Sequence, residues 1–134
     1  MSAERLRPDA ALIERLRAAI GDAGVVDDEP ALRHYNASPW SQAEGGAHVV
    51  LKPRSTKEVS ACMQLCAAAR VGVVPYGGGT GFLGGQIASA DGSEIVLSLE
   101  RMTAIRSLDA VSAACDRWGR GHGGRSARSG AGGR

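Results

Sequence analysis

The sequence predicts an α+β fold in which a small β-sheet is flanked by helices. Three observations carry this prediction: short apolar runs typical of buried strands, apolar residues at helical spacing between them, and a long glycine-rich loop. With 43% hydrophobic and 22% charged residues, the composition is that of a globular protein and excludes disordered, collagenous and disulfide-scaffold chains. A length of 134 residues allows one modest domain or part of a larger one.

Residues 1–46 are expected to form an N-terminal helical segment. Asp9 is a candidate N-cap, and apolar residues recur at helical spacing up to Ile20, where glycines end the pattern. Pro30 is expected to open a second, shorter helix. The polar stretch 38–46 contains proline and glycine, which predicts a surface loop.

A strand, a helix and two further strands are expected next. Ser55 and Glu58 have the spacing of a capping box at the start of a helix that runs to Arg70, and Gly72 ends it. Lys52 and Lys57 are interpreted as part of a solvated face. The expected strands are 48–51, 73–75 and 95–99, with Met102, Ile105 and Leu108 continuing the sheet or its edge.

The cysteines and apolar runs indicate the cellular environment. Three unpatterned cysteines favour a reducing compartment, and we expect the cytoplasm. The apolar runs are too short to span a bilayer, and the N-terminus lacks the pattern of a signal peptide. Cys62 and Cys66 share a helix face, but no histidine or acidic pattern accompanies them, so we expect core residues and no metal site.

A glycine-rich loop, residues 75–85, is the strongest functional signal in the chain. Glycine allows positive φ and close approach to a ligand, and successive backbone N–H groups in such a loop bind anions, typically phosphate. A P-loop is excluded because the loop ends in Gly84-Gly85-Gln86, without the required lysine. Six of the eleven residues are glycines: Gly77, Gly78, Gly79, Gly81, Gly84 and Gly85.

An NAD-binding Rossmann unit is a rival interpretation of the same loop. Residues 79–84 match G-x-G-x-x-G, and Glu100 lies 21 residues beyond Gly79, near the position of the ribose-binding acid. The motif requires a helix that begins inside the loop, however. Only residues 85–90 are available before the turn at Asp91, which is barely one helical turn.

Several motifs occur in a fixed order over some sixty residues. A hydrophobic strand precedes Pro53-Arg54-Ser55-Thr56-Lys57-Glu58-Val59; a helix, Gly72-Val73-Val74-Pro75 and the glycine loop follow; and the third strand ends in Leu99-Glu100-Arg101-Met102. In this order they resemble the PCMH-type FAD-binding domain of the vanillyl-alcohol-oxidase superfamily. The D-lactate, D-2-hydroxyglutarate and glycolate dehydrogenase branch is most similar, with a first helix, Tyr35 and Trp40, although Pro39 stands where that branch usually has Asp.

The resemblance implies the N-terminal portion of a PCMH-type FAD-binding domain, incomplete in this chain, with residues 47–113 as the partial subdomain. It implies non-covalent FAD, because the loop lacks the histidine through which some members attach flavin. The implied reaction is hydride transfer from a 2-hydroxy acid to flavin, giving a 2-oxo acid. Catalytic residues are expected outside the chain, so none is named, and the chain alone is expected to be inactive. The implied FAD ligands are the amides of Gly77, Gly78, Gly79 and Gly81 and the Thr80 hydroxyl, with Gly84 and Gly85 near the flavin.

Residues 114–134 differ in composition from the rest and are expected to be disordered. Five of the 16 basic residues and one of the 14 acidic residues lie in 115–134, which leaves a net charge of −2 for residues 1–114. An Arg/Gly tail suggests nucleic-acid binding as an alternative function, but it lacks interleaved aromatic residues apart from Trp118. Back-translation from Cys115, shifted by one base, permits a family-like continuation. We therefore interpret the tail as frameshifted and expect no nucleic-acid partner.

Overall fold

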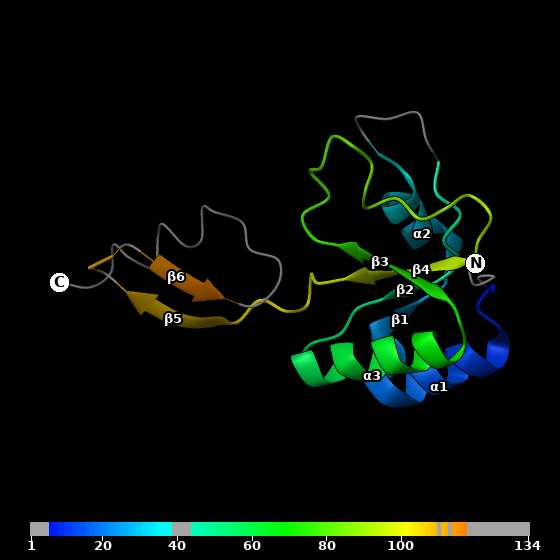
Figure 1. The fold of residues 1–134 in the computed structure, drawn as a ribbon, viewed down its shortest axis with the longest axis horizontal. Helices are drawn as coiled ribbons and strands as arrows, with labels where there is room; N and C mark the ends of the chain where they lie inside the picture. The colour runs from blue at the N-terminus through cyan, green and yellow to red at the C-terminus, as the bar shows by residue number, and fades with distance from the viewer. Residues whose placement is uncertain (1–5, 39–43, 110, 113, 118–134) are drawn as a thin grey trace, which may run out of the picture.

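The structure, a computed structural model, describes residues 6–38, 44–109, 111–112 and 114–117 (Figure 1). The elements are α1 (Ala10–Ile20), the 3-10 helix η1 (Asp22–Gly24), β1 (Val25–Val26), α2 (Glu29–Asn36), β2 (Val50–Leu51), α3 (Thr56–Ala68), β3 (Gly72–Tyr76), β4 (Glu94–Ser98), β5 (Ile105–Asp109) and β6 (Ala114–Arg117). A four-stranded sheet has the order β1-β2-β4-β3, in which β2 and β3 both run parallel to β4, and β1 runs antiparallel to β2.

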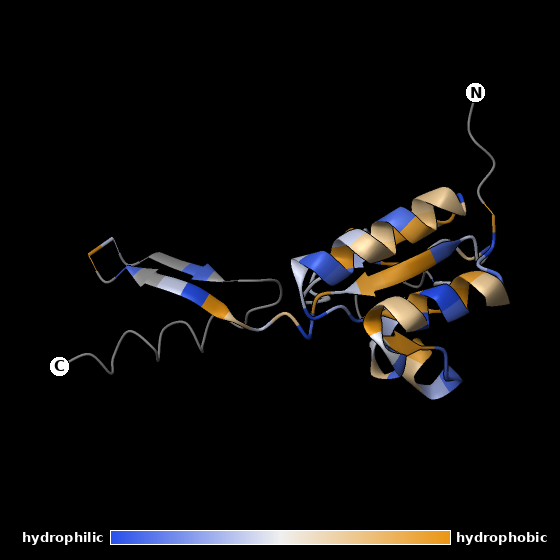
Figure 2. Cartoon of the chain, turned by 90° about the horizontal axis from the view of Figure 1, so that it is seen from below, coloured by the Kyte–Doolittle hydropathy of each residue, from blue (hydrophilic) through white to orange (hydrophobic). Residues whose placement is uncertain are grey.

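Helices cover both faces of this sheet, which confirms the predicted α+β class. On one face, α1 and α3 pack against the sheet through the larger hydrophobic core. On the other face, α2 and part of the glycine-rich connection enclose a second core, which contains Tyr35 and Tyr76. Figure 2, seen from the side of α1 and α3, shows apolar strand segments in the gap between these two amphipathic helices. The N-terminal segment therefore shares one folded body with the predicted subdomain.

Local capping explains where the main helices begin and end. The Asp9 side chain accepts a hydrogen bond from the backbone N–H of Leu12 at 2.8 Å, as predicted. Ser55 accepts from the Glu58 N–H at 3.2 Å, but the Glu58 carboxylate receives the N–H of Arg54 instead of that of Ser55.

The end of α3 differs from the prediction that Gly72 ends this helix. The N–H of Arg70 donates to the carbonyl of Ala67 and that of Val71 to Cys66, which is the pattern of a Schellman motif. Arg70 takes the left-handed conformation, φ 56°, that glycine usually supplies. The helix therefore ends at Ala68, and Gly72 is free to begin β3.

The C-terminal strands also differ from the prediction. β5 does not extend the main sheet; it pairs antiparallel with β6 in a separate two-stranded sheet, which projects from the body in Figure 1. Met102 is buried in the body, whereas Ile105 is 39% exposed. The described part of the predicted disordered tail, Ala114–Arg117, is therefore a strand, because the β5 backbone supplies its hydrogen-bonding partners. Residues 118–134 lie outside the described residues.

Within the described residues, no helix is both long and apolar enough to cross a membrane.

Candidate functional site

The glycine loop lies at the carboxyl edge of the parallel strands. Its first two residues, Pro75 and Tyr76, are the last residues of β3, and its glycines follow from Gly77 on. The Leu99 N–H donates to the Tyr76 carbonyl at 3.0 Å, which ties the ends of β3 and β4 together. β2 ends at the same edge, followed by Lys52. Ligands of α/β sheets bind outside the carboxyl ends of the strands, so this edge is the expected position for a cofactor.

Two glycines of the loop have a conformation that other residues rarely adopt. Gly79 and Gly84 both have φ +71°. A Cβ on Gly79 would also collide with the Tyr76 hydroxyl. Glycine at these two positions is therefore required by the fold of the chain itself.

The remaining loop glycines leave open space. A Cβ on Gly77 or Gly85 would meet no atom within 4 Å, and a Cβ on Gly78 would meet only the Thr80 side chain, at 3.8 Å. At Gly81 the Gln86 side chain is nearby, and its amide donates to the Gly81 carbonyl at 3.2 Å. The fold therefore leaves the space beside Gly77, Gly78 and Gly85 open, and we call this open space the cradle. Successive backbone N–H groups of a glycine-rich loop can bind a phosphate group.

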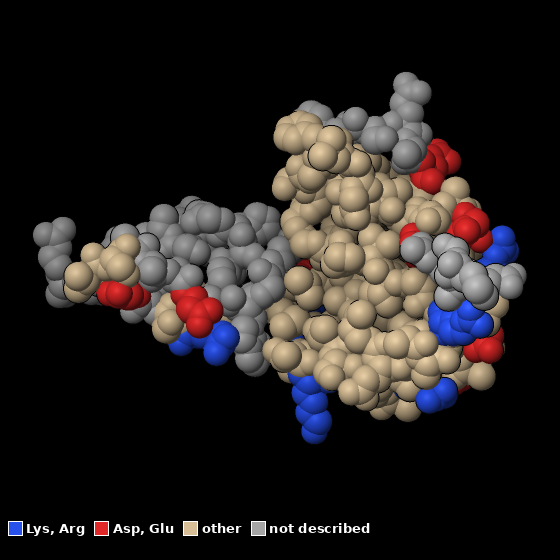
Figure 3. Space-filling model, in the orientation of Figure 1, with Lys and Arg blue, Asp and Glu red and all other residues tan. Residues whose placement is uncertain are grey.

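The loop carries no charged side chain. The sequence contains no Asp, Glu, Lys or Arg between Arg70 and Asp91. In Figure 3 the upper left of the main body, which this loop forms, is without blue or red, whereas the charged groups lie mainly along the right and lower margins. An anion bound here would therefore be held by backbone amides and the exposed Thr80 hydroxyl.

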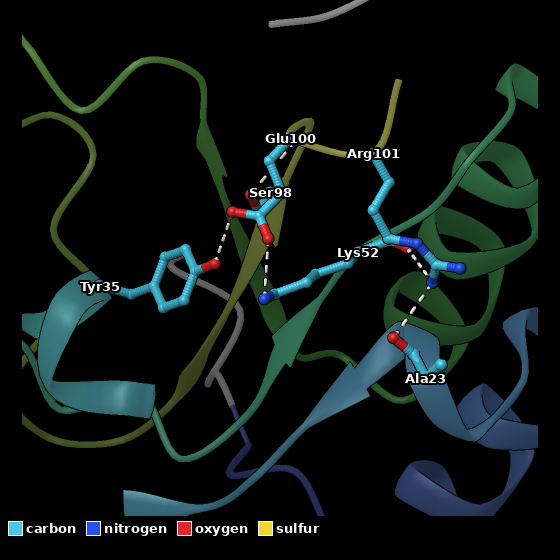
Figure 4. Close-up of polar contacts among 6 residues, drawn as sticks. All are labelled: Ala23, Tyr35, Lys52, Ser98, Glu100 and Arg101. Atoms are coloured by element: carbon cyan, nitrogen blue, oxygen red, sulfur yellow. Dashed lines mark hydrogen bonds and ion pairs between the residues drawn. The ribbon is translucent and has the colours of Figure 1, made fainter. Parts of the chain in front are cut away.

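Beside the loop, Tyr35, Lys52 and Glu100 form a polar group that we call the Glu100 cluster (Figure 4). The Tyr35 hydroxyl donates to Glu100 Oε2 at 2.8 Å, and Lys52 Nζ lies 2.8 Å from Oε1. Burial, followed by the hydrogen bond to Glu100, raises the pKa of Tyr35. Burial opposes the charge of Lys52, but the contacts with Glu100 and Tyr35 outweigh it and raise the pKa of this amine.

The Glu100 cluster argues against the Rossmann interpretation. The Glu100 carboxylate, the proposed ribose ligand, is bound by Lys52 and Tyr35 instead. No helix lies between β3 and β4, a segment that the structure describes completely. A dinucleotide fold needs both features, so the G-x-G-x-x-G match is coincidental.

The cluster also corrects the interpretation of Lys52 as a solvated residue, because its side chain is only 19% exposed. The position of Lys52 directly after a buried strand was the sequence signal that could have indicated its place in the Glu100 cluster. Arg101 lies next to the cluster and donates to the carbonyls of Ala23 and Lys52, both at 3.1 Å, which ties η1 to the end of β2.

The other candidate groups lie away from the loop. Cys62 and Cys66 are completely buried in the α1/α3 core, and burial is the main cause that raises each thiol pKa to about 11. Among the described residues, no cluster of His, Cys, Asp or Glu could hold a metal ion. A pocket of about 560 Å³ lies between α2 and residues 44–48, and none of the predicted loop residues lines it.

Comparison with known proteins places this arrangement in a family. A family described as "FAD binding domain" matches residues 47–116, slightly more than half of the chain. A probable mitochondrial D-2-hydroxyglutarate dehydrogenase of Oryza sativa subsp. indica is 35% identical over 100 residues, covering 75% of this chain and 18% of that protein. A putative mitochondrial D-lactate dehydrogenase of Schizosaccharomyces pombe is 33% identical over 107 residues, covering 75% of this chain and 20% of that protein.

Solved structures share the same fold. An alkyldihydroxyacetonephosphate synthase has a TM-score of 0.65 at 21% identity, over 81% of this chain and 22% of that one. A p-cresol methylhydroxylase has a TM-score of 0.57 at 18% identity, over 75% of this chain and 20% of that one. The chain thus spans about a fifth of the length of these relatives. With its strand order, its glycine loop and the match over residues 47–116, the chain belongs to the FAD-binding domain family of FAD-linked oxidases and dehydrogenases.

Proposed function

We propose that the glycine loop binds the pyrophosphate of FAD non-covalently, in a flavoenzyme that oxidises a 2-hydroxy acid to a 2-oxo acid. The single observation that carries the proposal is the open cradle beside Gly77, Gly78 and Gly85 at the carboxyl edge of the sheet. The names of the D-2-hydroxyglutarate and D-lactate dehydrogenases among the relatives support the substrate class.

In this proposal the residues of the chain bind and orient the cofactor. The amides of Gly77, Gly78, Gly79 and Gly81 donate to pyrophosphate oxygens, and the Thr80 hydroxyl adds a further donor. Hydrogen bonds to an anionic oxygen are stronger than bonds between neutral groups, which compensates for the absence of Lys and Arg in the loop. Gly84 and Gly85 let the chain pass close to the flavin.

When bound, FAD would supply the acceptor for the hydride that leaves the α-carbon of the hydroxy acid; the hydroxyl proton would pass to a base, and an external acceptor would reoxidise the flavin. Among the described residues we assign no catalytic base.

We propose the cytoplasm as the compartment, on the basis of the free thiols of Cys62 and Cys66. Several relatives carry "mitochondrial" in their names. Fractionation of the source cells with an antibody to the chain tests this.

Binding competition tests the pyrophosphate assignment. Quenching of flavin fluorescence on titration with the purified protein gives the Kd for FAD. ADP, which carries a pyrophosphate but no flavin, should compete, whereas riboflavin, which lacks phosphate, should bind weakly and fail to displace FAD. Equal affinity for riboflavin and FAD would contradict the pyrophosphate assignment. Competition by NAD equal to that by ADP would favour a general dinucleotide site.

We further propose that residues from about 115 are translated out of frame. The proposal rests on the excess of arginine and glycine in 115–134 and on the back-translation. The genomic sequence across codon 115 tests it, because a long open frame should continue the family pattern after a one-base shift. The 134-residue chain should then reduce no dye with D-lactate, D-2-hydroxyglutarate or glycolate, whereas the frame-restored protein should do so with one of them. Dye reduction by the 134-residue chain above background would contradict this.

A further inference from the structure

The phenol ring of Tyr76 packs against the glycine loop at Gly79. Tyr76 is the last residue of β3 and only 4% exposed. Gly79 lies so close to it that a Cβ at this position would collide with the hydroxyl and lie 2.9 Å from the ring carbon Cζ. The backbone at Gly79, with φ +71°, is therefore packed directly on the Tyr76 ring.

The Tyr76 ring is itself held by α2. The Tyr35 ring meets it edge to face, with 5.0 Å between the ring centroids and 72° between the planes. The centroid of the His34 ring lies 6.0 Å from the centroid of the Tyr76 ring. Because Tyr35 is only 3% exposed and edge-to-face pairs are directional, this contact restricts the orientation of Tyr76.

The Glu100 cluster fixes Tyr35 in turn. The Tyr35 hydroxyl donates to Glu100, and Lys52 Nζ lies 5.4 Å from the centroid of the Tyr35 ring while it pairs with the same carboxylate (Figure 4). A cation at this distance from an aromatic ring stabilises the arrangement. The ends of β2 and β4 thereby hold an α2 side chain against the end of β3.

We infer that Tyr35 and Tyr76 are positioning residues that set the backbone conformation of residues 77–81 for FAD binding. Helix α2, from the N-terminal segment, thus controls the affinity of a loop more than forty residues further along the chain. The predicted effect on FAD affinity rests on the proposed pyrophosphate site. The predicted effect on the order of residues 77–81 concerns the protein without FAD.

Two measurements separate positioning from general stability. Backbone 15N order parameters of residues 77–81, measured without FAD, report the order of the loop, and the FAD Kd reports its function. Tyr35→Leu removes the ring contact, and Tyr35→Phe keeps the ring but loses the bond to Glu100. Leu32→Ala is the matched control, because Leu32 is also buried in the α2 core but takes no part in the ring contacts that lead to Gly79.

We expect Tyr35→Leu to lower the loop order parameters from about 0.85 to below about 0.6. The lost ring contact should also raise the FAD Kd by about two- to tenfold. Tyr35→Phe should restore most of both values. Leu32→Ala should lower the Tm but leave the loop order unchanged. If Tyr35→Leu does not fold, Tyr76→Phe should loosen the loop in a different way, because it removes the hydroxyl, the Tyr76 atom that lies nearest to the Cβ position of Gly79.

Unchanged loop order in Tyr35→Leu, or in Tyr76→Phe should it be needed, would overturn the inference, as would an equal loss of order in Leu32→Ala. A failure of the wild-type protein to bind FAD would refute the proposed function instead. The order parameters alone would then decide the positioning role.

Discussion

Gly78→Val tests whether the loop is glycine-rich for its ligand or for its own fold. In the structure a Cβ on Gly78 would meet only the Thr80 side chain, with the hydroxyl oxygen at 3.8 Å and the methyl carbon at 4.0 Å, which are ordinary contacts. Gly78 is also absent from the positive-φ glycines. The substitution should therefore change the free energy of unfolding by no more than about 0.5 kcal/mol. For a protein of this size that is a Tm shift of about 3 °C or less.

The effect on FAD should be much larger. An isopropyl group on Gly78 would occupy the space where a phosphate oxygen must approach the amide. Loss of one hydrogen bond to a charged group costs about 1.5–3 kcal/mol. That corresponds to about a 10- to 150-fold rise in Kd. Gly78→Ala should lie between wild type and Gly78→Val, because its side chain fills less of the cradle.

Fluorescence titration with FAD and a thermal melt of the protein without FAD are the two assays, and Gly79→Ala is the contrasting variant. Gly79 has positive φ and packs on Tyr76, so alanine there should lower the Tm, with a conformational cost of about 1–2 kcal/mol. A wild-type FAD affinity in Gly78→Val would refute the assignment of the cradle to pyrophosphate. An equally lowered Tm in both variants would refute the distinction between ligand-facing and fold-determined glycines.

Three further predictions follow from the site and the core. Thr80→Ala should raise the FAD Kd by about 10- to 150-fold in the same titration without loss of folding, because one hydroxyl donor to a charged group is lost. Cys62 and Cys66 should react with a thiol reagent at pH 8 only after denaturation, because both are buried and their pKa values are raised to about 11; rapid labelling of either of these two residues in the native protein would contradict this. The folded pKa values of Tyr35 and Lys52 exceed their unfolded values, so the stabilisation that they provide is complete below about pH 10 and is lost as the pH rises through the folded pKa values. Urea unfolding from pH 8 to 11 measures this loss, which should shrink in the Tyr35→Phe/Lys52→Met double variant.

Local features of the fold could be predicted from the sequence because they depend on residues close together in the chain. Asp9 and Ser55 identified the starts of α1 and α3, since an N-cap needs only a side-chain oxygen two or three residues before the N–H groups that it binds. β2, β3 and β4 lie within one or two residues of the predicted strands. The two-residue β1 is too short to have a periodic pattern, and β6 lies in the segment that was predicted to be disordered. The glycine loop was evident because its composition is extreme.

The end of α3 and the pairing of β5 could not be predicted in this way. Arg70 in a left-handed conformation contradicts its own preference, and the Schellman hydrogen bonds that stabilise it appear only once the helix is built. β5 has an ordinary strand pattern, and such a pattern does not indicate which other strand it pairs with. β5 pairs with β6 in a local hairpin, in which Asp109 lies opposite Ala114, and not with the main sheet.

The sequence by itself indicated the family and the α+β class, and it predicted the residues of the candidate site, because each of these depends on short motifs and their order. Only the tertiary structure decided how those residues are used. It separated Gly79, which the Tyr76 ring and a positive φ require, from Gly78, which faces open space. It also showed that the Glu100 carboxylate, a candidate ribose ligand in the sequence, contacts Lys52 and Tyr35 instead. The physical reason is that parallel strands bring their carboxyl ends to one edge, where side chains from distant parts of the chain meet and a local pattern carries no information about its neighbours.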